Sequence, residues 1–209
     1  MKNIGDSRKG KFIVVEGVEG AGKSRQCAML VDSLNALGVS AVLTREPGGA
    51  PLAEKLRALI LDPEYSPDAV TELYLYSAAR RDHLNKIIFP ALDSGNVVVC
   101  DRFIYSTLAY QGYGRGLDLD FIRNVNAHTI APLEVDLAMF IDVSPEEGFA
   151  RKGGADKSDR LECESLEFFN RVYNGFNEMC NAGELVRIDG SGKKEQTADN
   201  ILRAVRRIL

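Results

Sequence analysis

The chain contains one short glycine-rich stretch that strongly constrains both its fold and its chemistry. Gly17-Val18-Glu19-Gly20-Ala21-Gly22-Lys23-Ser24 matches the pattern G-x-x-x-x-G-K-[S/T]. An apolar, β-rich run from Lys11 to Val15 precedes it, and apolar side chains at helical spacing follow from Gln26 to Leu37. The pattern therefore lies between a predicted strand and a predicted helix, which is the context that a phosphate-binding loop requires.

The residue types in this loop suit the binding of a triphosphate. Glycines let successive backbone N–H groups turn inward around phosphate oxygens at the N-terminus of the following helix. Lys23 is placed to reach the β- and γ-phosphates, and the Ser24 hydroxyl to coordinate Mg²⁺. We therefore predict a site for a nucleoside triphosphate. The alternative is a glycine-rich turn that matches by chance, which the agreement of strand, loop and helix disfavours.

Strand-like apolar runs alternate with segments of helical periodicity along the rest of the chain. Strands are expected at 12–15, 39–43, 97–100, 137–141 and 185–188, and helices at 52–61, 69–92, 119–130, 161–182 and 196–209, the second of these bent near Pro90. This alternation predicts an α/β fold with a parallel sheet flanked by helices. We expect one domain over residues 1–209.

A polar, glycine-containing stretch at 152–160 follows the fourth predicted strand. Its position favours a small mobile lid at about 151–160, and the alternative is an ordinary connector between helices.

Charge and hydropathy narrow the class of partner. The net charge of −4 argues against a nucleic-acid binder with a general basic face and favours a small anionic ligand. No apolar run approaches membrane-spanning length, and the polar N-terminal residues do not form a secretory signal. We therefore expect a cytoplasmic protein without a membrane or nucleic-acid partner.

The arginines indicate a second phosphate-bearing substrate. Arg45, Arg57, Arg80 and Arg102 each lie near a predicted strand end or on a helix leaving that edge of the sheet. In a parallel sheet the ligand crevice lies outside the carboxyl ends of the strands, so these side chains can converge there. The sequence has neither the Asn-Lys-x-Asp guanine-reading motif nor the Leu-Ser-Gly-Gly-Gln transporter signature. A regulatory or switch NTPase remains the alternative to a kinase.

Four motifs in order resemble the bacterial thymidylate kinases, and the likeness runs from Phe12 to about Asp189. They are the loop from Glu16 to Ser24, Thr44-Arg45-Glu46-Pro47-Gly48-Gly49, Tyr76-Ser77-Ala78-Ala79-Arg80, and Asp101-Arg102-Phe103 followed by Ser106-Thr107-Leu108-Ala109-Tyr110-Gln111-Gly112. The resemblance implies phosphorylation of dTMP by ATP on a three-layer P-loop NTPase fold with a five-stranded parallel sheet flanked by helices. It also implies a homodimer. A kinase for another nucleoside monophosphate is the nearest alternative activity.

The resemblance also assigns roles to individual residues. The loop residues Gly17, Val18, Glu19, Gly20, Ala21, Gly22, Lys23 and Ser24 would hold ATP together with Arg151, and Ser24 and Asp101 would hold Mg²⁺. The dTMP site would comprise Glu19, Arg45, Pro47, Arg57, Tyr76, Arg80, Arg102, Thr107, Tyr110 and Gln111. Within that set Tyr76 would stack on thymine, Arg80 would donate to its O4, and Arg57 and Arg102 would grip the phosphate.

The lid departs from the family pattern. The glycine-rich loop has Gly20-Ala21 and no arginine between its outer glycines. Thymidylate kinases that lack an arginine in this loop usually supply cationic residues from the lid. Here the stretch offers only Arg151, Lys152, Lys157 and Arg160. We expect Arg160 to act in catalysis with Lys23 and Arg102, and Arg151 to stack on adenine near residues 189–191.

Overall fold

Five parallel strands form the centre of the protein. The structure, a computed structural model, describes residues 9–153 and 159–209; Lys157 therefore lies outside the described residues. The strands are β1 (Phe12–Glu16), β2 (Ala41–Arg45), β3 (Val97–Asp101), β4 (Leu137–Asp142) and β5 (Val186–Asp189), and their order in the sheet is β2-β3-β1-β4-β5. All five predicted strands are confirmed, with ends that shift by one or two residues.

The central strands carry apolar residues on both faces because helices cover both sides of the sheet. Every residue of β1 and β3 is buried, which explains their continuous runs of Val and Ile in place of polar alternation. The core built on these strands continues into the aromatic side chains of the later helices, including Phe168, Phe169 and Phe176.

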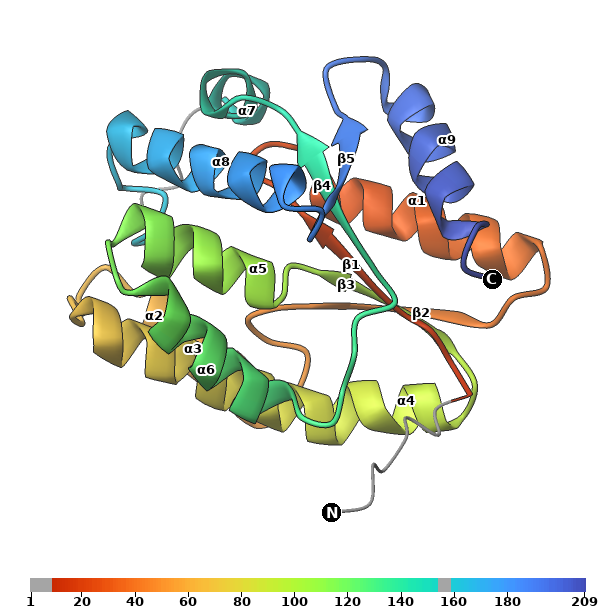
Figure 1. The fold of residues 1–209 in the computed structure, drawn as a ribbon, viewed down its shortest axis with the longest axis horizontal. Coiled ribbons are helices and arrows are strands. Elements are labelled where there is room, and N and C mark those ends of the chain that lie inside the picture. Colours follow the sequence, from red (N-terminus) through yellow and green to blue (C-terminus); the bar gives the residue numbers. More distant parts are fainter. Residues whose placement is uncertain (1–8, 154–158) are drawn as a thin grey trace.

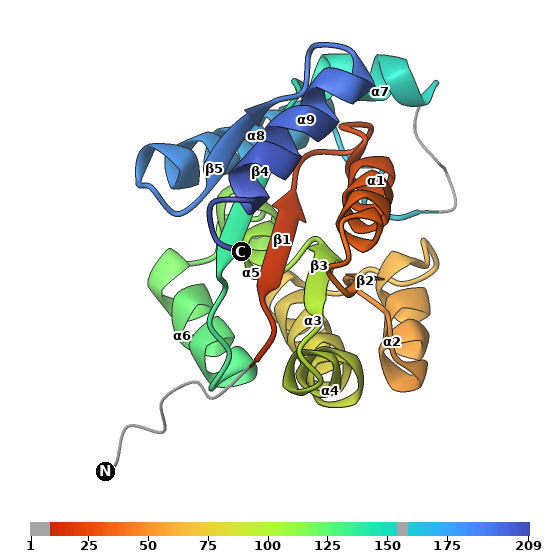
Figure 2. The ribbon, with the colours of Figure 1, turned by 90° about the vertical axis from the view of Figure 1, so that its right-hand side faces the viewer.

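Two helical layers flank the sheet (Figures 1 and 2). The described helices are α1 (Lys23–Ala36), α2 (Pro51–Leu61), α3 (Ala69–His83), α4 (Phe89–Asp93), α5 (Ile104–Thr107), α6 (Leu119–Ile130), α7 (Pro145–Lys152), α8 (Leu166–Asn181) and α9 (Lys194–Val205), with two π-helical segments, η1 (Leu84–Ile88) and η2 (Leu108–Gly114). From β1 the chain crosses to β2 at one edge of the sheet, and the later strands β3, β4 and β5 follow in the opposite direction across the sheet. Right-handed crossovers therefore place α1 on one face and the connections after β2 on the other.

Three predicted helices differ from those in the structure. The helix predicted at 196–209 is Lys194–Val205, so it ends four residues earlier than predicted. The segment predicted as one helix over 69–92 is divided into α3, the π-helical η1 and α4, and Pro90 lies in the first turn of α4. Proline cannot donate an N–H to the preceding turn, and a widened turn accommodates its ring. The prediction of a helix from residue 161 was wrong at its start. Helix α8 begins at Leu166 because the Ser165 side chain accepts a hydrogen bond from the Phe168 N–H and caps it.

The carboxyl ends of three neighbouring strands bring polar residues to one edge. Val15 and Arg45 are both paired in register with Asp101, the last residue of β3. Glu16 ends β1 immediately before the glycine-rich loop. This edge is where the candidate site lies. None of the helices in the described part of the chain is both long and apolar enough to cross a bilayer.

Candidate active site

A cavity of about 240 Å³ opens at the carboxyl ends of β1, β2 and β3. Every residue predicted to hold the acceptor lines it: Glu19, Arg45, Pro47, Arg57, Tyr76, Arg80, Arg102, Thr107, Tyr110 and Gln111. Gly20, Lys23, Ser24 and Asp101 line the same cavity. The structure thus brings the predicted nucleotide loop, metal residues and acceptor residues to one place.

The glycine-rich loop has the backbone that its sequence predicts. Gly20 and Gly22 have φ angles of 73° and 86°, in the region that glycine adopts readily, and α1 begins at Lys23 without a side-chain cap. The N–H groups of its first turn are therefore available for an anion. Lys23 Nζ donates to Val18 O at 2.7 Å. Burial and the nearby Arg102 lower the pKa of Lys23 to about 8, against the opposing effect of the surrounding carboxylates.

The loop also packs against the backbone of α7. A Cβ atom on Gly20 would lie 1.9 Å from Gly148 O, and one on Gly148 would lie 2.2 Å from Glu19 O. Both positions therefore need glycine, because any side chain would force the two backbones apart. The contact fixes α7, which leads to the predicted lid, against the phosphate-binding loop.

Ser24 and Asp101, the residues predicted to hold Mg²⁺, are in hydrogen-bond contact with each other. Ser24 Oγ donates to Asp101 Oδ2 at 2.5 Å, while Asp101 Oδ1 is buried and has no hydrogen-bond partner among the described residues. A buried, unpartnered carboxylate oxygen beside a hydroxyl is the kind of donor set that Mg²⁺ prefers. The residues present therefore fit the predicted metal.

Arg102, directly after β3, has an uncommon backbone conformation and contacts the glycine-rich loop. Its φ is 70°, which is uncommon for a residue other than glycine. Nη1 donates to Gly17 O at 3.0 Å, and Nη2 to Glu19 Oε1 at 2.7 Å. The other oxygen of Glu19 accepts from the Tyr110 hydroxyl at 2.6 Å. Burial raises the pKa of Glu19, but the positive charges of Arg102 and Lys23 outweigh it and hold the pKa below its ordinary value.

Glu16 stabilises the segment that follows Arg102. It is fully buried, and its Oε1 accepts from the backbone N–H groups of Phe103 and Ser106 at 2.8 and 3.2 Å. Its Oε2 accepts from Ser106 Oγ at 2.6 Å. Burial raises the pKa of Glu16 to about 7, although these hydrogen bonds and the charge of Arg102 act in the opposite direction. Glu16 thus links β1 to the segment that presents Arg102.

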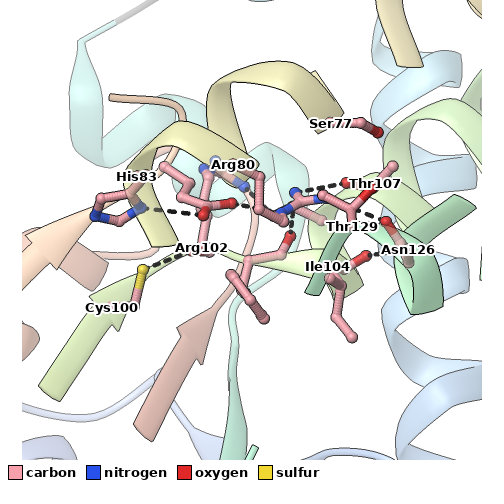
Figure 3. A network of polar contacts seen from close by, with 12 residues as sticks. Ser77, Arg80, His83, Cys100, Arg102, Ile104, Thr107, Asn126 and Thr129 are labelled. Atoms are coloured by element: carbon pink, nitrogen blue, oxygen red, sulfur yellow. Dashed lines mark hydrogen bonds and ion pairs between the residues drawn. The ribbon is translucent and has the colours of Figure 1, made fainter. Parts of the chain in front are cut away.

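Arg80 lines the cavity and donates hydrogen bonds to four other residues (Figure 3). Its Nε donates to Glu46 Oε2 at 2.7 Å, its Nη1 to Asn126 Oδ1 at 3.1 Å, and its Nη2 to Phe103 O and to Thr107 Oγ1 at 3.3 and 2.8 Å. A guanidinium has five N–H groups, so one on Nη1 is left for a ligand. Glu46 is held in turn by His83, whose Nδ1 lies 3.1 Å from Glu46 Oε1.

Three more of the residues predicted to hold the acceptor line the same cavity and have partners of their own or a buried hydroxyl. Arg57 Nη1 donates to Pro47 O at 2.9 Å, which ties α2 to the segment after β2. Arg45 forms an ion pair with Glu54 at 3.0 Å. Tyr76 lies on α3 one turn before Arg80, and burial raises the pKa of its hydroxyl above the ordinary value. A neutral phenol ring therefore faces the cavity beside the guanidinium.

Some predicted residues do not line the cavity: Gly17, Val18, Ala21 and Gly22 of the loop, and also Arg151 and Arg160. Arg151 Nη2 donates to Glu147 Oε1 at 2.5 Å and to Gly190 O at 2.8 Å, so it lies beside residues 189–191 as predicted. Arg160 Nη2 donates to Glu72 Oε2 at 2.5 Å, and its Nε to Ile60 O at 3.1 Å. Lys152, which does line the cavity, forms an ion pair with Glu162.

Comparison with known proteins agrees with this geometry. The sequence model of the family described as "Thymidylate kinase" matches residues 15–201. A thymidylate kinase of Synechococcus sp. (strain JA-2-3B'a(2-13)) is 48% identical over 198 residues, covering 93% of each chain. One from Psychrobacter sp. (strain PRwf-1) is 44% identical, covering 94% of this chain and 97% of its own. This chain belongs to the thymidylate kinase family.

The fold of a solved thymidylate kinase is also shared. The crystal structure of thymidylate kinase from Ehrlichia chaffeensis superposes with a TM-score of 0.76 at 31% identity, covering 94% of this chain and 98% of that one. The five-stranded parallel sheet flanked by helices is therefore the fold of a thymidylate kinase.

Sequence reasoning missed three buried glutamates that organise this thymidylate kinase site: Glu16, Glu46 and Glu72. A signal existed for two of them, since Glu16 ends β1 and Glu46 directly follows β2, where polar residues reach the ligand edge. Glu72 gave no such signal, because a glutamate in a predicted helix is usually solvated.

Proposed function

We infer that this chain transfers the γ-phosphoryl group of ATP to dTMP, giving ADP and dTDP. The observation that carries this function is the single cavity shared by Lys23 of the nucleotide loop, Arg102 beside it and the base-reading Arg80. A site with both phosphate-binding and base-reading groups suits a nucleoside monophosphate as acceptor. Membership of the thymidylate kinase family supports thymine as its base.

The reaction needs positive charge more than proton transfer. An oxygen of the dTMP phosphate forms a bond to the γ-phosphorus, and the bond from that phosphorus to the β–γ bridging oxygen breaks, so that ADP leaves with the electron pair. The attacking oxygen is already anionic, so no general base is required. Lys23 would exchange Val18 O for the transferring phosphoryl group, and Arg102 would exchange Gly17 O for the acceptor phosphate.

We propose that Ser24 and Asp101 hold Mg²⁺ when ATP is bound. The ion supplies charge neutralisation on the phosphate oxygens. The unpartnered Asp101 Oδ1 supports this assignment, because a buried carboxylate oxygen without a donor is costly unless a ligand completes it.

Recognition of the deoxynucleoside follows from the remaining contacts. Tyr110, whose hydroxyl donates to Glu19, lines the cavity and would crowd the 2′ position of a ribose, which favours deoxyribose. Pro47 lines the cavity and would contact the thymine methyl group. A methyl group in an apolar pocket contributes about 1–3 kcal/mol, so dUMP should be poorer by roughly 10- to 200-fold in kcat/KM.

The lid remains a prediction, since residues 154–158 lie outside the described residues. Arg160 is proposed to help neutralise the transferring group, which requires it to leave Glu72. An arginine acting in this way contributes about 10³- to 10⁵-fold to turnover. If Arg160→Ala keeps turnover within a few-fold of the parent at saturating substrates, Arg160 serves only as a partner of Glu72.

We also propose that the protein is a homodimer. Val70 and Tyr74 are exposed on the outer face of α3, and the Tyr74 ring lies 6.5 Å from that of Phe121 on α6. An apolar surface of this kind is typical of a subunit contact. Sedimentation of the parent and of Tyr74→Glu tests this, because the variant should become monomeric.

The activity is tested by coupling ADP release to each nucleoside monophosphate in turn. The highest kcat/KM should be for dTMP, with dUMP next and CMP, AMP and GMP far lower. If another monophosphate is the best acceptor, the assignment of the base site is wrong. If ADP release does not depend on any monophosphate, the chain hydrolyses or binds nucleotide for another purpose.

A further inference from the structure

Glu72 on α3 is a buried carboxylate that none of the assigned roles uses. It is fully buried and accepts hydrogen bonds from three side chains. Gln111 Nε2 donates to its Oε1 at 2.7 Å, and Arg160 Nη2 to its Oε2 at 2.5 Å. Arg115 reaches both oxygens at 3.3 and 3.4 Å. One acidic group thus connects the cavity residue Gln111 to two guanidinium groups behind it.

The contact with Glu72 fixes which way the Gln111 amide points. A carboxylate beside two guanidinium groups only accepts hydrogen bonds, so the amide must turn its NH₂ toward Glu72. Its Oε1 is then turned away from Glu72, and no residue that the structure describes donates to that oxygen, so it can accept a hydrogen bond from a ligand. Gln111 is almost fully buried and lines the cavity, so it cannot reorient into bulk water.

Gln111 and Arg80 together then present one acceptor and one donor to a base. Arg80 has a free N–H on Nη1, and Gln111 has a free Oε1. Thymine carries an acceptor, O4, beside a donor, N3–H, whereas cytosine carries a donor, the 4-amino group, beside an acceptor, N3. The pair of protein groups matches thymine and opposes cytosine at both positions.

We propose that Glu72 is a specificity-determining positioning residue, which selects thymine over cytosine by fixing the orientation of the Gln111 amide. This inference rests on the proposed function and extends it. Glu72 lies behind Gln111 and acts on base selection through it. Arg115 and Arg160 also contact the carboxylate, but the orientation of the Gln111 amide depends on its own contact with Glu72 and does not require both arginines in place at once.

The same arginines determine what happens when Glu72 becomes glutamine. Arg160 and the Nη2 group of Arg115 both donate at the Oε2 position, so the new carbonyl oxygen takes that position. The new NH₂ then points at Gln111 and displaces the longer contact from Arg115 Nε. Gln111 must turn its own oxygen toward that NH₂. Its NH₂ group then faces the base, where it opposes the N3–H of thymine and matches N3 of cytosine.

The experiment measures kcat/KM for dTMP and for dCMP in the parent, Glu72→Gln, Gln111→Met and the double variant. In Glu72→Gln the dTMP/dCMP ratio should fall by at least about 10-fold, since a mismatched buried donor costs one hydrogen bond or more. In the Gln111→Met background, Glu72→Gln should leave the ratio unchanged, because there is no amide left to turn. Loss of stability alone would lower both substrates together and leave the ratio as it was.

Arg115→Met is the matched control. It weakens the same cluster and removes the ion pair with Glu164, but leaves the contact between Glu72 and Gln111 in place. Its dTMP/dCMP ratio should equal that of the parent. An unchanged ratio in Glu72→Gln, or an equal fall in the Gln111→Met background, overturns the inference while dTMP kinase activity of the parent stands. If the parent does not phosphorylate dTMP, the proposed function itself fails.

Discussion

Glu16 should make the stability of the protein depend on pH in a direction opposite to that of most acidic residues. Burial raises its pKa from an ordinary 4.5 to about 7, so the folded state holds this proton more tightly than the unfolded state does. The stability that the protonated form contributes is complete below pH 4.5 and is lost as the pH rises through 7. The difference between the two pKa values corresponds to at most about 3 kcal/mol.

Glu16→Gln removes the ionisation and keeps the hydrogen bonds. The new carbonyl oxygen can accept from the N–H groups of Phe103 and Ser106, and the new NH₂ can donate to Ser106 Oγ, which reverses that one bond. The variant should therefore match the parent near pH 5 and exceed it by up to about 3 kcal/mol in unfolding free energy at pH 8.

Urea unfolding of both proteins between pH 5 and 8 measures this difference. Glu167→Gln makes the same chemical change on the exposed outer side of α8 and reports the effect of the amide alone. Ser106→Ala removes a hydrogen bond that favours the ionised form, so it should move the loss of stability to higher pH. A difference between Glu16→Gln and the parent that stays constant from pH 5 to 8 would refute the reasoning.

Three further variants test the site. Lys23→Ala should abolish turnover with an unchanged melting temperature, because the glycines set the loop and Lys23 supplies charge; near-normal ADP release would show that the loop assignment is wrong. Arg102→Ala should weaken dTMP far more than ATP in isothermal titration, by about 1.5–3 kcal/mol for each charged hydrogen bond lost, and equal losses would place Arg102 elsewhere. Gly148→Ala puts a Cβ atom 2.2 Å from Glu19 O, and the resulting overpacking of about 1–3 kcal/mol should outweigh the gain in helix propensity. The variant should therefore have a lower melting temperature and a higher KM for ATP. Glu146→Ala, at an exposed position of the same helix, is the control.

The sequence alone determined the elements whose signals are local. The loop from Gly17 to Ser24 needs particular backbone angles and one lysine, and both requirements are written in consecutive residues. The buried strands are continuous apolar runs, so their number and parallel arrangement followed from pattern. The residues proposed to hold the acceptor could be named because they occur in motifs, and all of them line one cavity.

Some features were mispredicted because the interactions that determine them leave no periodic pattern in the sequence. The start of α8 depends on the Ser165 side chain, which accepts a capping hydrogen bond from the Phe168 N–H. The division of the segment 69–92 before Pro90 comes from a π-helical turn that no periodicity reveals. Segment η2, which carries Tyr110 and Gln111, is buried on all sides and so lacks the one-sided pattern that marks an amphipathic helix.

Only the tertiary structure decided what the acidic residues do. Glu16 and Ser106 are 90 positions apart, and Glu72 and Arg160 are 88 apart, yet each pair shares a hydrogen bond. A carboxylate has no fixed role in a sequence, because burial and its partners set its charge and orientation. The fold alone brings such partners together, and for this reason the groups that aim Arg102 and Gln111 became visible only in three dimensions.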